Sequence, residues 1–135
     1  MSVIAKLFAG LSGVIHCLFF LMESVFWKNP AVHGVFKVGS LADAEVIDVF
    51  IKNQGFYNLF LAGGIFAGLA LVSRYQTVGI TLISYVCLYM AGASVVLLFT
   101  QPAMVKGVLI QGVPPLIALA ALYVSRISIR TQEQG

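Results

Sequence analysis

The chain has 135 residues, of which 60% are hydrophobic and 10% are charged, and its formal net charge is +3. A mean hydropathy of +0.99 excludes an ordinary soluble globular domain, in which charged residues are far more frequent. The basic residues stand singly at the ends of apolar stretches, where they anchor membrane helices, and this scatter argues against a nucleic-acid partner. The composition therefore predicts a single integral membrane domain over residues 1–135, with the lipid bilayer as its partner.

The first apolar stretch predicts a membrane-spanning helix over about residues 4–27. From Leu7 to Trp27 the only formal charge is that of Glu23, and this length suits a helix that crosses a bilayer. A cleaved signal peptide fits less well, because no small-residue cleavage pattern ends the stretch and because His16 and Glu23 interrupt it. We therefore expect a retained span.

The segment after the first span predicts a loop followed by a surface helix. An Asn-Pro pair ends the first helix, since proline disfavours helix at the residue before it. Residues 31–39 are then expected to form a loop that leaves His33 exposed. Ser40 and Asp43 match a helix capping box. Apolar residues on one face of residues 41–53 predict an amphipathic helix at the membrane surface that leads into the second span.

Three further stretches, each free of charge and long enough to cross a bilayer, predict the remaining spans at about residues 55–73, 77–99 and 107–125. The second span contains Gly64-x-x-x-Gly68, a small-residue pattern that favours close helix packing and leaves a homo-oligomer open. Pro114 and Pro115 are expected to interrupt the fourth span, because proline cannot donate a backbone hydrogen bond.

Short connections between the last three spans predict antiparallel neighbours. The fold class is therefore all-α: an antiparallel four-helix transmembrane bundle with a surface amphipathic helix in the first loop. Four spans place both termini on one side. The two sides carry equal numbers of basic residues: Lys6, Arg74, Arg126 and Arg130 against Lys28, Lys37, Lys52 and Lys106. Because the terminal arginines flank their span closely, we favour cytoplasmic termini in a multi-pass protein of the inner (plasma) membrane.

Glu23 is the strongest candidate for a functional residue. A charged side chain within a span costs roughly 3 kcal/mol on insertion scales, and such residues usually face the bundle interior with a partner or a function. His16 lies two turns earlier on about the same helix face. Both are therefore candidate catalytic residues.

In an antiparallel bundle, each of the four helices has one polar side chain at about the same depth, near the side that bears the long first loop. These residues are Glu23, Asn58, Ser94 and Gln111. Gln54 lies one turn before Asn58, His16 and Tyr89 lie deeper, and Trp27 is expected over the cluster, at its mouth.

Structural roles are open for these residues too. Trp27 and Tyr57 fit interfacial anchors, and Asn58 and Gln111 fit interhelical hydrogen bonds worth about 0.6 kcal/mol each on average.

The intramembrane residues predict no metal site and identify no cofactor. One glutamate and one histidine fall short of the three or four ligands that zinc takes. Ligation of a haem by His16 alone stays open without support. The sequence has no phosphate-binding loop, dinucleotide fingerprint or nucleophile elbow.

Three motifs resemble those of a family of small bacterial integral membrane proteins, catalogued as a domain of unknown function, number thirteen-hundred-and-four. They are the run NQGFYNLFLAG at residues 53–63, the set His16, Glu23 and Trp27, and Gln111-Gly112-x-Pro114. The third helix departs from the family, with YMAGA at residues 89–93 in place of a more glycine-rich stretch. The resemblance covers nearly the whole chain and implies a four-helix membrane fold. It marks the same polar residues, Asn53, Gln54 and Tyr57 among them, and implies no activity.

Three functions are compatible with these features. In the first, the protein binds or processes a small lipophilic or cationic molecule. Glu23 and His16 would serve as counter-ion or general acid and base, and the pocket would be formed by Trp27, Asn53, Gln54, Tyr57, Asn58 and Gln111. The second is a small proton-coupled transporter, which the long first loop and the off-centre position of Glu23 disfavour. The third is a structural membrane subunit without a ligand. Whether the protein is an enzyme stays open.

Overall fold

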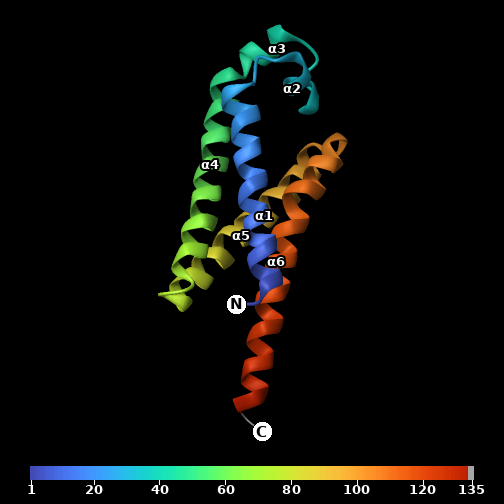
Figure 1. Cartoon of the computed structure of the whole chain (residues 1–135). Helices are drawn as coiled ribbons and strands as arrows, with labels where there is room; N and C mark the ends of the chain where they lie inside the picture. The colour runs from blue at the N-terminus through green and yellow to red at the C-terminus, as the bar shows by residue number, and fades with distance from the viewer. Residues whose placement is uncertain (134–135) are drawn as a thin grey trace.

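The computed structural model describes the backbone of residues 1–133 and the side chains of residues 1–125 and 127. Four long helices form the molecule (Figure 1): α1 (Val3–Phe20), extended by the π-helical turn η1 (Leu21–Val25), α4 (Asp48–Leu71), α5 (Gln76–Thr100) and α6 (Val105–Glu133). Four segments are long and apolar enough to cross a membrane: Val3–Val25, Asp48–Leu71, Gln76–Thr100 and Pro102–Ser125. The predicted all-helical fold with four spans is confirmed.

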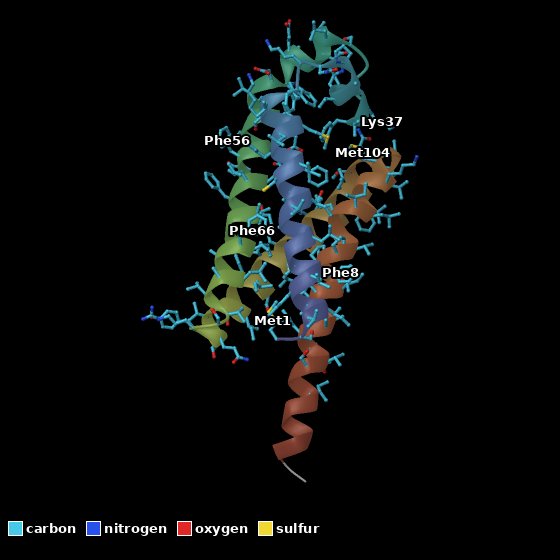
Figure 2. The ribbon with its side chains drawn as sticks, viewed as in Figure 1. Met1, Phe8, Lys37, Phe56, Phe66 and Met104 are labelled. Carbon is cyan, nitrogen blue, oxygen red and sulfur yellow. The ribbon has the colours of Figure 1, made fainter. Side chains whose placement is uncertain are left out.

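The helices run up and down in a ring. α1 packs beside α4 and α6, and α5 packs beside the same two helices. The N-terminus and the α4–α5 turn lie at one end of the bundle, which we call the terminal end (Figure 1). The opposite end, called the loop end, carries α2 (Pro30–Val35), α3 (Leu41–Val46) and the short 3₁₀ connection η2 (Pro102–Met104) between α5 and α6. In Figure 2, Lys37 and Met104 accordingly lie at the opposite end of the bundle from Met1.

The buried apolar core fills the half of the bundle nearest the terminal end. Its members are Ala5, Ala9, Ile65, Ile83, Val86, Cys87, Met90, Ala118 and Leu122. Glycines bring α4 and α5 together there: a Cβ added at Gly79 would lie 2.6 Å from the carbonyl oxygen of Gly68, and one at Gly64 would lie 3.0 Å from the Val86 side chain. The small-residue pattern of the second span is therefore used within the chain, for close helix contact.

The first loop contains a short helix where only a loop was predicted. α2 (Pro30–Val35) begins at Asn29, whose side chain accepts a hydrogen bond from the Ala31 N–H, and proline suits the first helical position. His33 was predicted to be exposed, and this was wrong. Its side chain is 4% exposed, because its Nδ1 lies 2.9 Å from the Val38 carbonyl oxygen and its ring packs against Trp27.

The predicted surface helix over residues 41–53 is divided in two. α3 (Leu41–Val46) starts at Ser40, whose hydroxyl accepts from the Asp43 N–H as the capping pattern predicted. The helix ends at Ile47, and residues 48–53 form the first turns of α4. The amphipathic segment therefore supplies a short helix at the loop end and lengthens the second span.

α6 continues through Pro114 and Pro115, so the predicted interruption was wrong. Both prolines are buried, and the carbonyls of Ile110 and Gln111 lack their usual helical donors because proline has no N–H. Membrane helices tolerate such prolines where neighbouring helices surround them. Arg126 and Arg130, which entered the topology prediction, lie outside the described side chains.

Candidate functional site

Glu23 lies in the π-helical turn η1, where the Phe26 N–H donates to the Leu21 carbonyl oxygen at 2.8 Å. Such turns are rare and frequently occur at functional sites. The Glu23 side chain is 6% exposed, and its Oε2 accepts a hydrogen bond of 2.7 Å from Nδ2 of buried Asn58. Within the described residues this is the only hydrogen bond of the carboxyl group, and no lysine, arginine or histidine forms an ion pair with it.

A second contact between η1 and α4 fixes the position of Glu23. The Ser24 hydroxyl donates to the Lys52 carbonyl oxygen at 2.9 Å, which joins the two helices one residue after Glu23. Gly55 permits this approach, because an added Cβ would collide with the Ser24 hydroxyl and would lie 3.1 Å from the Glu23 Cβ. The absence of a side chain at position 55 therefore allows the carboxyl group to reach Asn58.

Beside Glu23 lies a cavity of about 680 Å³ in the half of the bundle nearest the loop end. Side chains from all four long helices contribute to its wall. Six of them are polar: Glu23, Gln54, Asn58, Tyr89, Thr100 and Gln111. The others are apolar or small, with Phe19, Phe36 and Met104 among the largest. The cavity therefore combines a mainly apolar wall with a few convergent polar groups, as small-molecule sites do.

The structure brings four of the predicted site residues together at this cavity: Glu23, Gln54, Asn58 and Gln111. Ser94, the predicted fourth member of the polar level, is buried but does not line the cavity. Its hydroxyl donates to the Ala91 carbonyl oxygen at 2.7 Å, and its Cβ would lie 2.9 Å from a Cβ added at Gly112. Ser94 therefore contributes to close packing between α5 and α6.

Trp27 was expected at the mouth of the site, and the structure places it elsewhere. Its side chain is 1% exposed, and its Nε1 donates to the Ala44 carbonyl oxygen in α3 at 2.9 Å. Its ring packs edge-on against Phe36 with 5.5 Å between ring centroids. Phe36 lines the cavity and Trp27 does not. Trp27 thus fixes the loop that supplies Phe36, a contact between distant residues that no local motif indicates.

Asn53 and Tyr57 were predicted to contribute to the pocket, but neither lines the cavity. Both side chains are exposed, and Nδ2 of Asn53 donates to the Tyr57 hydroxyl at 3.0 Å. The reason is helical spacing: residues 53 and 57 lie one turn apart on one face of α4, whereas residues 54 and 58 occupy the neighbouring face. The signal that distinguishes the two faces of α4 is the helical period with which its buried residues recur along the sequence.

His16 lies behind the wall of the cavity. It is fully buried, its Nδ1 lies 2.8 Å from the Ser12 carbonyl oxygen, and its Nε2 has no partner among the described residues. Phe19 lines the cavity and packs edge-on against His16 at 5.6 Å between ring centroids. Contact between His16 and a molecule in the cavity therefore requires movement of Phe19, and its catalytic role stays a prediction. No three His, Cys, Asp or Glu side chains of the described residues gather as metal ligands.

Comparison with known proteins identifies a family. The family described as "Protein of unknown function (DUF1304)" matches residues 10–123, a segment that contains every residue of the wall of the cavity. No curated protein matches the chain, and no solved structure matches it. Because the family match covers most of the sequence, this protein belongs to the DUF1304 family, whose function is unknown.

Proposed function

We propose that this multi-pass membrane protein binds a compact lipophilic molecule in the cavity and that Glu23 recognises the polar group of that molecule. One observation carries the proposal: a buried carboxyl group lies in the wall of a cavity of about 680 Å³. Sites for small molecules typically enclose roughly 300–1,000 Å³. We place the protein in the inner (plasma) membrane, with both termini in the cytoplasm.

The chemistry of the wall supports a ligand with an apolar body and one polar end. Asn58 satisfies part of the hydrogen-bonding capacity of Glu23, and an ionised carboxylate accepts several more hydrogen bonds. The side-chain amides of Gln54 and Gln111 can both donate and accept. The apolar residues around them favour a molecule that is itself apolar over most of its surface.

The division of the bundle into a packed half and a hollow half favours binding over transport. Alternating access needs a site near the bilayer midplane that can open to either side. Here the apolar core fills the half nearest the terminal end, and the cavity lies in the other half. If the bound molecule is also processed, Glu23 is the group in the wall with the chemistry to transfer a proton.

Native mass spectrometry after gentle extraction tests the proposal. We expect the wild-type protein to retain a small molecule and Glu23→Gln to lose it while keeping its helical circular dichroism spectrum. Glu45→Gln is the matched control, because it makes the same chemical change at an exposed position of α3. The proposal fails if no molecule is retained and Glu23→Gln only lowers thermal stability in detergent, which is the result expected of a structural subunit.

A further inference from the structure

We infer that the cavity opens sideways into the bilayer between α4 and α5, and that it admits a membrane-dissolved molecule with an amine or quaternary ammonium head. This inference rests on the proposed function and adds to it the route of the ligand and the chemistry of its polar end. It is carried by the exposure of particular wall residues, by the packing of α4 and α5 and by the lack of a cationic partner for the Glu23 carboxyl group among the described residues.

The exposed residues of the wall mark where the cavity opens. Tyr89 and Val96 on α5 line the cavity, yet they are 54% and 61% exposed. Gln54, on the facing helix α4, also lines the cavity and is exposed. Since α5 ends at Thr100, Val96 and Tyr89 lie about 6 and 16 Å below its end at the helical rise of 1.5 Å per residue. The opening therefore faces hydrocarbon over most of its height.

α4 and α5 diverge toward the loop end (Figure 1), where each is held to a different neighbour. There α4 is joined to η1 by the Ser24–Lys52 hydrogen bond and by the close approach at Gly55. α5 is held to α6 by the close approach of Ser94 and Gly112. The glycine contacts between α4 and α5, at Gly68 and Gly79, belong to the other half.

The charge of the site favours a cationic head. A carboxylate at this depth is costly without a partner, and the described residues supply a hydrogen bond from Asn58 but no cation. Lys52, the nearest lysine along α4, pairs with Asp48 at 2.8 Å. The aromatic rings of Phe19, Phe36 and Tyr89 line the same cavity, and ring faces attract ammonium groups. A positively charged head would therefore complete the site.

An indole placed in the opening tests the inference. A Cβ added at Gly92 or at Gly63 meets no atom within 4 Å, and of the two only Gly92 lines the cavity. The full-length variants Gly92→Trp and Gly63→Trp are reconstituted in phosphatidylcholine vesicles with or without brominated acyl chains. Trp27 is the only native tryptophan, so wild-type fluorescence supplies the background to subtract. We expect brominated lipid to quench the added indole at both positions and aqueous iodide to quench neither.

Dodecyltrimethylammonium, added to the vesicles at low mole fraction, tests the chemistry of the head. We expect it to relieve the quenching in Gly92→Trp but not in Gly63→Trp, and we expect the relief to be lost when Glu23→Gln is combined with Gly92→Trp. Dodecanol, which carries no charge, should give no relief.

The possible failures are distinguishable. Quenching of Gly92→Trp by iodide and not by brominated lipid would overturn the sideways opening and leave the proposed function standing. Quenching by brominated lipid with no relief, or with equal relief in the Glu23→Gln background, would overturn the ammonium head. Loss of the proposed function itself is read separately, from the native mass spectra. Should Gly92→Trp fail to fold, Val96→Trp places the indole at an exposed residue of the same wall.

Discussion

Asn58 supplies to Glu23 the kind of hydrogen bond that water supplies to a carboxylate on a protein surface. The Nδ2–Oε2 distance of 2.7 Å is at the short end of the usual range for an N–H···O hydrogen bond. Both side chains are buried, so no solvent replaces the donor if it is removed. The pair also joins η1 to the neighbouring helix α4, which makes a single amide important both for the site and for helix association.

We predict that Asn58→Leu lowers the free energy of unfolding in detergent by about 1–2 kcal/mol, because the buried carboxyl group loses its donor. Asn53→Leu makes the same change on the exposed face of α4, where it removes only the hydrogen bond to Tyr57. It should change stability by less than about 0.5 kcal/mol. Equal losses in both variants, measured by reversible denaturation, would contradict a special role for the buried pair.

At the scale of the elements, α4 and α6 each carry a Gln-Gly pair with the same structural role. Gln54 on α4 and Gln111 on α6 both line the cavity, and each is followed by a buried glycine that lies against a neighbouring helix. Gly55 abuts Ser24 and Gly112 abuts Ser94. In each Gln-Gly pair the polar side chain faces the cavity and the glycine lets the next helix approach. The close approach of a neighbouring helix explains in physical terms why the two motifs contain glycine at these positions.

Alanine substitutions at two glycines of α4 should have opposite effects. Gly55→Ala places a methyl group against the Ser24 hydroxyl and the Glu23 Cβ, so we expect destabilisation of about 1–3 kcal/mol and loss of the retained molecule. Gly63→Ala meets open space and should stabilise the helix by roughly 0.5–1 kcal/mol. Thermal unfolding in detergent measures both effects. Stabilisation by Gly55→Ala would show that η1 and α4 are not in close contact.

The sequence predicts the spans well because apolar length is a local property of the chain. Counting residues along antiparallel helices also places Glu23, Asn58 and Gln111 at one level, and the structure brings them to one cavity. The first loop is less predictable, since the burial of His33 and the position of Phe36 depend on Trp27 reaching Ala44 in α3. Proline chemistry alone predicts an interruption of α6, yet neighbouring helices cover Pro114 and Pro115 and the helix continues.

At the scale of the whole molecule, an even number of spans places the N-terminus and the C-terminal end of α6 at the same end of the bundle (Figure 1). Reporter fusions at Lys37 and at the C-terminus should therefore give opposite signals. We expect the cytoplasmic signal from the C-terminal fusion, because Arg126 and Arg130 closely follow the fourth span and basic residues near a span favour the cytoplasmic side. Equal signals would require an odd number of spans, and reversed signals would invert the orientation.

The packed half and the hollow half of the bundle occupy different leaflets of the bilayer, since the core lies near the terminal end and the cavity near the loop end. A molecule that enters from the bilayer leaves the lipids of one leaflet and occupies space that the protein already encloses. The area that the remaining lipids of that leaflet must share therefore falls on binding, while the other leaflet is unaffected. Ligand occupancy and lipid packing are thus thermodynamically linked, and a membrane that crowds that leaflet favours the occupied form.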